Sequence, residues 1–591
     1  MPHPRELTAR AVLTGAGLGA TLSLCNIYSG LKIGWSFNMS ITAALIGFGL
    51  WKMAEAAGAA RFEKLENNIN QTAASAGASI SSAGLVSAIP AMTLLTGQTL
   101  SWAELSVWVF LIGCVGVLTG VLMRRQMIEV DKLPFASGIA SAETLERMYA
   151  SGAEAMRKVY ALLGAGLAAA GLKALIHYAK IPHVALPGAI AAGGRRVTMM
   201  NATVALDPSP LMIAVGALGS LRTGVSMLTG ALFAWLVLGP IAVEHGWATV
   251  PDDAGPDQAW FVHLMKWLLW PGVAMMVTAS LTSVALSWRA VVRTFTGGRA
   301  SGADTEEEAA EKKASLDTVP VRSLLLFGGA LVVAITLTQV VLFDIAWWAA
   351  LLAVFLTVAL AAVAGRVSGE TTITPVGAMG KVTQLVFGLA VPANPTANLM
   401  CANVTGGAAS QCADLLHDLK AGAILGASPR RQSIAQTLGV LGGALAGSAA
   451  YLVLLPDPER QIMETGEWAA PAVHTWKAVA EIFAQGMSAM PPYALEAMAI
   501  GGAAGVVLTV LEKVLPKKAA PWVPNPAAFG LAFVVQAWYA ISLFAGSVLG
   551  FVLRRYAKGW SELYLVPICA GVIAGESLMG FAIAMQSILA P

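Results

Sequence analysis

The densest group of residues able to bind a ligand or carry a proton is the run Asn398–Lys420, NLMCANVTGGAASQCADLLHDLK. It lies between two strongly apolar stretches, so we expect it at membrane depth. A lipid-facing helix does not tolerate this load, because each unpaired polar group in hydrocarbon costs several kcal/mol. The polar side must face protein or water. A polar, glycine-interrupted segment of this kind is typical of a transport site.

Three titratable residues of this run, Asp414, His417 and Asp418, are spaced to share one helical face. They could carry protons, contact a chelated metal, or form an ion pair with Lys420 at a helix end. Direct metal ligation is disfavoured, because a site needs three or four converging ligands. We therefore predict proton coupling for Asp414 and His417, and no metal site. The residues predicted here to bind substrate are Asn398, Asn403 and Gln411.

The composition excludes most soluble classes. Of the 591 residues, 57% are hydrophobic and 12% charged, about half the charged fraction of a soluble domain. The net charge of +3 does not suggest a nucleic-acid surface. The five cysteines form no CxxC pair and are expected to be small core residues. No removable signal peptide, nucleotide-binding loop or cofactor motif is recognised.

Apolar stretches long enough to cross a membrane number 16 or 17. The stretches 134–150 and 476–490 are short and charged, so they are expected to be re-entrant. The stretch 209–243 is over-long and contains several glycines, so it is expected to be broken. The predicted fold is an all-α polytopic membrane protein of about 16–17 transmembrane helices, some of them discontinuous or re-entrant.

Weak internal repeats suggest two homologous halves. Residues 68–75 match 403–410 at an offset of 335, and 207–210 match 523–526 at an offset of 316. The domain prediction is a first transmembrane repeat at 1–289, a linker loop and spare helix at 290–344, and a second repeat at 345–591.

Charge placement suggests an orientation. The loop with Arg61 and Lys64 is basic and the loop 244–257 is acidic, which places the N-terminus in the cytoplasm. The charge pattern is reversed in the second half, as an inverted repeat would produce. Arg157 and the lysines of 513–518 oppose that inversion, so inverted and parallel halves both remain open.

The first half has polar groups of its own. A stripe beginning at Glu66 enters the third span, and its amides are costly unless paired. The alternative is that they join helices, at about 0.6 kcal/mol per contact. The motif NIYSGLKIGW, at 26–35, suggests a cationic gate or an ordinary interfacial turn. The residues predicted here to bind substrate are Asn26, Tyr28, Lys32, Asn67, Asn68 and Gln71.

Two further segments complete the predicted site. A discontinuous helix before Pro375 would present free amide groups to a substrate carboxylate, although simple capping explains the same pattern. Glu576 lies within the last span, where an acidic residue is expected to function in proton coupling or to bond a neighbouring helix. The residues added to the predicted substrate site are Glu370, Thr371, Thr372 and Gln384.

These motifs together resemble the oligopeptide transporter family, including its yellow-stripe-like metal-chelate branch. The matching segments are NIYSGLKIGW, LENNINQTAASAGAS, LPFASGIASAETL, SGETTITPVGAMGKVTQL, ANVTGGAASQCADLLHDLKAGAILGASPRRQ and GVIAGESLMG. They cover nearly the whole chain in the family's order. The resemblance implies a bundle of roughly 16 helices and secondary uptake of small peptides, peptide-like molecules or metal chelates. It is to bacterial-type members, which implies a cytoplasmic (inner) membrane.

The predicted function is a secondary active transporter, in which substrate binds between the halves and a proton moves with it. The alternatives are a membrane-embedded enzyme acting on a lipid-linked substrate, and a passive channel. An enzyme would need catalytic clusters in large interfacial loops, and a channel would need a repeated filter motif. The expected partners are the substrate, protons and the lipid bilayer, without nucleic acid. Homo-oligomerisation is left open.

Overall fold

A computed structural model of the chain describes residues 5–251, 254–289, 292, 294, 320–371, 374–486, 490–516 and 518–589. The helices before residue 290 are α1 (Ala9–Ile33), α2 (Ser40–Ala56), α3 (Lys64–Ala78), α4 (Ala88–Thr96), α5 (Trp102–Arg124), α6 (Ala136–Ala150), α7 (Gly152–Tyr178), α8 (Leu211–Leu218), α9 (Leu221–Phe233), α10 (Gly239–Glu244) and α11 (Phe261–Leu286).

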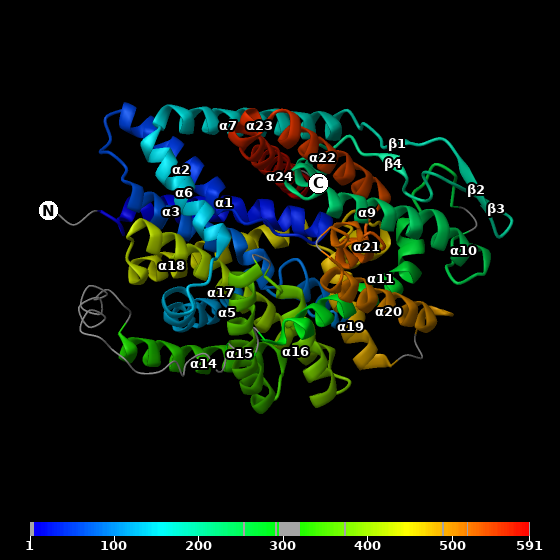
Figure 1. The fold of residues 1–591 in the computed structure, drawn as a ribbon. Coiled ribbons are helices and arrows are strands. Elements are labelled where there is room, and N and C mark those ends of the chain that lie inside the picture. Colours follow the sequence, from blue (N-terminus) through cyan, green and yellow to red (C-terminus); the bar gives the residue numbers. More distant parts are fainter. Residues whose placement is uncertain are drawn as a thin grey trace.

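The helices after residue 320 are α14 (Val321–Phe343), α15 (Trp347–Thr371), α16 (Val376–Ala390), α17 (Pro395–Leu425), α18 (Pro429–Leu454), α19 (Pro471–Gln485), α20 (Ala494–Val514), α21 (Pro526–Leu531), α22 (Ala537–Tyr556), α23 (Lys558–Trp560) and α24 (Val566–Leu589) (Figure 1). Short 3₁₀ segments are η1 (Ser79–Ala83) and η7 (Ala520–Trp522), and π segments are η2 (Arg125–Val130), η3 (Ala234–Leu238), η5 (Glu459–Glu464) and η8 (Ser561–Leu565).

Twelve helical segments in the described ranges are long and apolar enough to cross a membrane. The predicted all-α polytopic fold is confirmed, and five of the predicted stretches do not meet these criteria of length and composition. Every predicted stretch contains a helix. However, α2, α6, α16 and α19 have only 15 to 17 residues, which is shorter than the roughly 20 needed to cross the bilayer. Helix α17 also fails the criteria: with 31 residues it is long enough to cross the bilayer, but it is too polar to count as an apolar span.

The predicted breaks lie where glycine and proline interrupt the apolar pattern. The stretch 209–243 divides into α8, α9, η3 and α10, and the helix before Pro375 ends at Thr371. One break was not predicted: the stretch 68–96 is interrupted by η1 and by Gly84, whose φ of +104° is left-handed. A Cβ at Gly84 would collide with the Asn403 amide. By contrast α17 continues without a break through Gly406 and Gly407, which permit close packing there.

Residues 179–210 form two small antiparallel sheets beyond α7, at the right edge of Figure 1. Strand β1 (Val184–Ala185) pairs with β4 (Ala205–Leu206), and β2 (Ala189–Ala192) pairs with β3 (Arg195–Thr198). Gly193 and Gly194, both with positive φ, form the tight turn that such a hairpin requires. No strand was predicted, because segments of two to four residues are too short for a period-2 signal.

The matching segments of the two halves run in opposite directions. Gln71 of α3 bonds Asp418 of α17, whereas Ser82 of η1 bonds Ser410, so α3 and α17 are antiparallel. The pair α5 and α18 is antiparallel as well, because Trp102 donates to the Leu445 carbonyl while Gly113 packs against Val440.

Element boundaries also recur at the offset of 335. Both ends of α19 lie 335 residues after the corresponding ends of α6. Each helix follows a residue with left-handed backbone, Phe135 and Ala470, at the same interval. The segments 125–129 (RQMIE) and 460–464 (RQIME), also 335 apart, both lie in π segments. At this offset the repeat signal thus extends well beyond residues 68–75, where the sequence suggested it.

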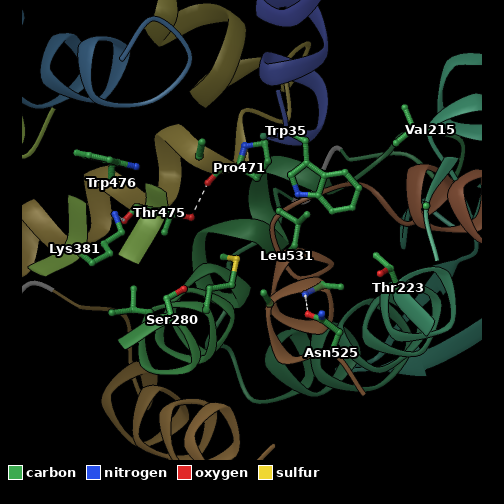
Figure 2. Close-up of a pocket in the computed structure, with 18 of the residues that line it drawn as sticks. Trp35, Val215, Thr223, Ser280, Lys381, Pro471, Thr475, Trp476, Asn525 and Leu531 are labelled. Carbon is green, nitrogen blue, oxygen red and sulfur yellow. Dashed lines mark hydrogen bonds between the residues drawn. The ribbon is translucent and has the colours of Figure 1, made fainter. Parts of the chain in front are cut away.

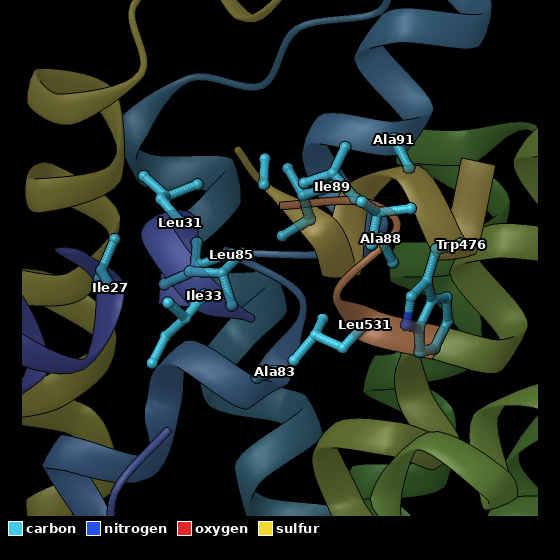
Figure 3. Close-up of a cluster of buried hydrophobic side chains, with 14 of the residues drawn as sticks. Ile27, Leu31, Ile33, Ala83, Leu85, Ala88, Ile89, Ala91, Trp476 and Leu531 are labelled. Carbon is cyan, nitrogen blue, oxygen red and sulfur yellow. The ribbon is translucent and has the colours of Figure 1, made fainter. Parts of the chain in front are cut away.

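The two halves share one apolar core (Figure 3). Leu31 at the end of α1, together with Leu85 and Ile89 around the start of α4, packs in the same cluster as Trp476 of α19 and Leu531 of α21. All five side chains are buried. In lipid, helices associate through close packing more than through removal of apolar surface from water. This core fixes the ends of several short helices relative to one another.

Candidate functional site

A cavity of about 620 Å³ lies where the two halves meet (Figure 2). Its volume is within the range of about 300–1,000 Å³ typical of small-molecule sites. The end of α1 and helices α8, α9 and α11 line it from one half, and α16, α19 and α21 line it from the other. The residues that line the cavity include Trp35, Val215, Lys381, Trp476 and Leu531.

Lys381 is the one charged side chain among the described residues that line this cavity. It is 3% exposed. Its Nζ donates to Gln384 Oε1 (2.7 Å) and to the Thr475 carbonyl (3.4 Å), and lies 4.4 Å from the centroid of the Trp476 ring. No carboxylate of the described chain is paired with it. Neutral acceptors and an aromatic face therefore surround this cation.

Several helices begin at the cavity wall. Gly377 is the second residue of α16, Ala472 the second residue of α19, and Thr223 the third residue of α9, and all three line the cavity. The first turn of a helix has backbone N–H groups without an intrahelical acceptor, and carries partial positive charge. The wall is thus biased toward anionic groups on several sides.

A second buried lysine lies nearby, in a different environment. Lys32 Nζ is 3.3 Å from Glu576 Oε1, and lies over the rings of Tyr28 and Tyr539 at 5.2 and 5.7 Å. Glu576 is completely buried. It also accepts from Ser209 Oγ (2.6 Å) and from the backbone N–H of Leu211 (3.0 Å). The predicted site residues Tyr28, Lys32 and Glu576 therefore form one compact group.

Two short segments connect this group to the cavity. Leu211 is the first residue of α8, and Val215 and Leu218 of the same eight-residue helix line the cavity. Lys32 is followed after one residue by Gly34 and Trp35, which also line it. A change in the bonds made by Glu576 acts directly on the start of α8.

Loop residues extend the same group toward the surface. Asp207 Oδ1 accepts from the backbone N–H of Ser209 (3.0 Å) and lies 3.6 Å from His183 Nε2. The His183 ring stacks on Trp538 with centroids 4.3 Å apart. Burial raises the pKa of Asp207 and lowers the pKa of His183. In both groups burial thus disfavours the charged form.

The polar stripe of α3 is located at its interface with α17. Gln71 Nε2 donates to Asp418 Oδ1 (3.2 Å) and to Asn68 Oδ1 (3.3 Å). Asn67 donates to the Ala44 carbonyl of α2 and accepts from Asn70. Within the described chain, Asn68 Nδ2, Gln71 Oε1 and Asp418 Oδ2 are buried without a hydrogen-bond partner. The stripe mainly joins helices, with a few polar atoms unsatisfied.

The predicted residues of α17 divide between two neighbourhoods. Gln411 donates to the Ala76 carbonyl and accepts from Gln436, so it belongs to the α3 interface. Asn398 exchanges hydrogen bonds with Gln384, at 2.9 and 2.7 Å. Since Gln384 accepts from Lys381, this pair forms a layer behind the cavity wall. Asn403 packs on Gly84 and does not reach that layer.

The two candidate proton carriers of α17 differ in setting. Asp414 is partly accessible and bonds Ser79. His417 is buried, with Nε2 2.9 Å from Ser368 Oγ and its ring edge-on to Phe135. Neither lines the cavity.

The remaining predicted residues have local structural contacts. Asn26 exchanges hydrogen bonds with the backbone of Phe37 and also donates to the Ala78 carbonyl, so it fixes the turn after α1. Glu370 is exposed and paired with Arg366. Thr371 donates to the Val367 carbonyl of its own helix. Thr372 lies outside the described residues.

The site therefore differs from the expectation of one converging set. Most of the predicted residues fall into a Lys32–Glu576 group, an α3–α17 interface and the Gln384–Asn398 layer, while the others make local contacts. Among those that the structure describes, none lines the cavity. The physical reason is that buried amides are satisfied most cheaply by one another. Lys381 was missed, although an intramembrane lysine without a nearby acidic residue in the sequence was a usable signal. In the described ranges, no group of three or more His, Cys, Asp or Glu could hold a metal ion.

Comparison with known proteins gives a consistent match. The family described as OPT oligopeptide transporter protein matches residues 6–586. A putative oligopeptide transporter of Saccharomyces cerevisiae is 23% identical, over 98% of this chain and 95% of its own length. A probable metal-nicotianamine transporter of Oryza sativa subsp. japonica is 23% identical, over 100% of this chain and 94% of its own.

A metal-nicotianamine transporter of Arabidopsis thaliana is also 23% identical, over 98% of this chain and 92% of its own length. Both kinds of relative are transporters, which excludes the enzyme alternative. The match extends over nearly the whole chain, as the motifs in the sequence indicated. The chain belongs to the OPT oligopeptide transporter family, and is an integral membrane transporter.

Proposed function

We propose that this transporter carries small peptides, peptide-like molecules or metal chelates together with protons, and that its substrate binds in the cavity between the halves. The observation that carries the proposal is the cavity itself. It has the volume of a small-molecule site, it is lined from both halves, and the ends of several short helices meet at it. Sites of secondary transporters form where discontinuous helices meet between repeats.

For proton coupling we favour Glu576, with Asp414 as the second candidate. Glu576 as a carboxylate accepts from Lys32, Ser209 and the first residue of α8. A proton on Glu576 would remove its charge and weaken these bonds. Helix α8 also lines the cavity. Protonation of Glu576 would therefore release the first residue of α8, while the other end of this helix contacts the substrate. Asp414 has no comparable connection to the cavity wall.

We further propose that the halves, 1–289 and 345–591, are inverted repeats, with α14 as the spare helix. The antiparallel pairs α3–α17 and α5–α18 and the recurring offset of 335 support this. An N-terminus in the cytoplasm of a bacterial inner membrane fits the basic loop at Arg61 and Lys64. That loop lies close to the N-terminal segment, since Arg10 donates to the carbonyls of Ala60 and Arg61.

The test of coupling uses proteoliposomes loaded with buffer at equal or different pH. Wild-type protein is expected to accumulate Fe(II)–nicotianamine or a tripeptide only with an inward proton gradient. Glu576→Gln should lose accumulation but keep exchange of labelled for unlabelled substrate, because exchange needs no net proton movement. Asp414→Asn is the matched control, and should retain accumulation.

Three outcomes would contradict parts of this proposal. Gradient-independent uptake by the wild type would exclude proton coupling. Full accumulation by Glu576→Gln together with loss in Asp414→Asn would transfer the coupling role to Asp414. Full accumulation by both variants would remove both candidates.

A further inference from the structure

We infer that Lys381 binds a free carboxylate of the transported substrate, so that this transporter selects peptides or chelates that present at least one carboxylate to the cavity. The inference deepens the proposed function, on which it rests, by naming the chemical group that the site recognises.

The charge of Lys381 is not balanced by the residues that the structure describes around it. Lys381 is 3% exposed, and its contacts in the described chain are the Gln384 amide oxygen, the Thr475 carbonyl and the Trp476 ring. A buried cation without an anionic partner is strongly unfavourable, and real proteins pair or coordinate such charges. A substrate carboxylate would supply the missing negative charge. Gln384 and Thr475 account for two of the three N–H donors of an ammonium group, which leaves one for a ligand.

The second argument is position. Lys381 lies on the cavity wall, and Figure 2 shows its side chain beside Trp476 and Thr475 at one end of the space. No acidic side chain of the described residues lines the cavity. Gly377, one helical turn earlier in α16, also faces it, and a Cβ there would meet no atom within 4 Å. The first turn of α16 is thus open to a ligand beside the lysine.

The third argument is a contrast within the protein. Lys32 is buried to a similar degree, but its charge is balanced by Glu576. The fold is therefore able to provide an internal carboxylate for a buried lysine, and the residues that the structure describes provide none for Lys381.

The rest of the cavity suits the remainder of such a substrate. Trp35, Leu531 and Met276 contribute aromatic and apolar surface. Figure 2 places Trp35 and Leu531 together, apart from Lys381. A molecule with a carboxylate at one end and apolar or amide groups elsewhere matches this division.

The experiment compares ligands that differ only in the carboxylate. Trialanine and tetraalanine, their C-terminal amides, and Fe(II)–nicotianamine are titrated against the full-length protein in detergent, with thermal unfolding as the readout. Wild-type protein is expected to prefer at least one free-carboxylate peptide over its amide by about tenfold or more, the effect of one charge-assisted hydrogen bond. Lys381→Met should abolish this preference, and Lys381→Arg should retain part of it.

Lys477→Met is the matched control. Lys477 lies on α19 next to Trp476, is paired with Glu481, and does not line the cavity. Lys477→Met should leave the preference for the free carboxylate over the amide unchanged. Lys381→Gln replaces Lys381→Met if the latter does not fold, as judged by its elution profile. The inference is overturned if no carboxylate probe binds more tightly than its amide, or if Lys381→Met keeps the wild-type preference.

Failure of this inference is distinguishable from failure of the proposed function. Gradient-driven uptake that does not distinguish acid from amide would refute the carboxylate contact and leave the transport proposal standing. A carboxylate preference in binding without gradient-driven uptake would support the carboxylate contact and refute the transport proposal.

Discussion

Two buried lysines, one in each half, have opposite surroundings. Lys32 forms an ion pair with Glu576, lies over two tyrosine rings, and shares Glu576 with the Ser209 hydroxyl. Among the described residues, Lys381 contacts neutral acceptors and a tryptophan ring, and it lines a cavity.

The difference indicates which charge is part of the structure and which is available to a ligand. A paired buried charge is costly to disrupt, because removing one partner leaves the other uncompensated. An unpaired buried charge already carries the free-energy cost of lacking a partner, so removing that charge by mutation should not lower the stability of the fold. The charge of Lys32 is therefore satisfied by the protein itself, while Lys381 is available to a ligand in the cavity. Three measurements test this comparison.

The largest effect is expected for Lys32→Met. It should lower the free energy of unfolding by about 3–5 kcal/mol, because Glu576 is left buried and unpaired. Chemical unfolding of the full chain in detergent measures this value. The double variant with Glu576→Gln should recover most of the loss. Lys381→Met should change stability by less than about 1 kcal/mol, and an equal loss at both lysines would break the comparison.

Two glycines test the packing of the same two regions. A Cβ at Gly580 would collide with the Tyr28 ring, whereas a Cβ at Gly377 would meet open space. Gly580→Ala should therefore destabilise the protein by about 1–3 kcal/mol through overpacking. Gly377→Ala should be neutral, or stabilising by up to about 1 kcal/mol, since alanine is the better helix former. Similar losses in the two variants would mean that the cavity wall is as closed as the lysine–glutamate group.

The smallest effect concerns pH and the loop beside the Lys32–Glu576 group. Burial lowers the pKa of His183. Between that lowered pKa and the ordinary value near 6.5, the unfolded chain binds more protons than the folded one, so stability falls as the pH falls. His183→Gln lacks this contribution. The stability of the wild type relative to the variant should therefore decrease from pH 7 to pH 5, in thermal unfolding scans.

Asp207→Asn is the control for that measurement, because the pKa of Asp207 is raised by burial and its contribution has the opposite sign. A difference in stability between the wild type and His183→Gln that is independent of pH would contradict this prediction. That result would show that the imidazole is no more buried in the folded protein than in the unfolded chain.

Much of the fold could be predicted from the sequence. Apolar stretches of membrane length located the long helices that the structure describes. Charge and length identified α6 and α19 as short, but not α2 and α16. The breaks at Pro375 and near Gly219 followed from glycine and proline chemistry. The break at η1 could not be predicted, because Gly84 is set by contact with Asn403, which is more than 300 residues away. The small strands of 184–206 were missed because their pairing partners are not periodic in sequence.

The candidate site was predictable only in part. Polarity inside apolar stretches correctly marked Glu576, Gln384 and the amides of α3 and α17 as buried, whereas Tyr28 and Lys32 were expected between two spans and are buried as well. It could not say whether each polar atom faces a ligand or another protein group, because periodicity places a residue on a face without identifying what covers that face.

The sequence alone determined the membrane class, the family and the residues that must be buried with their polar groups satisfied, because these follow from local composition and spacing. Only the tertiary structure decided that Lys32 has a carboxylate partner and that Lys381 has none within the described part of the chain. Ion pairing and cavities depend on which distant helices meet: Glu576 is 544 residues from Lys32, and most of the cavity wall around Lys381 comes from other helices.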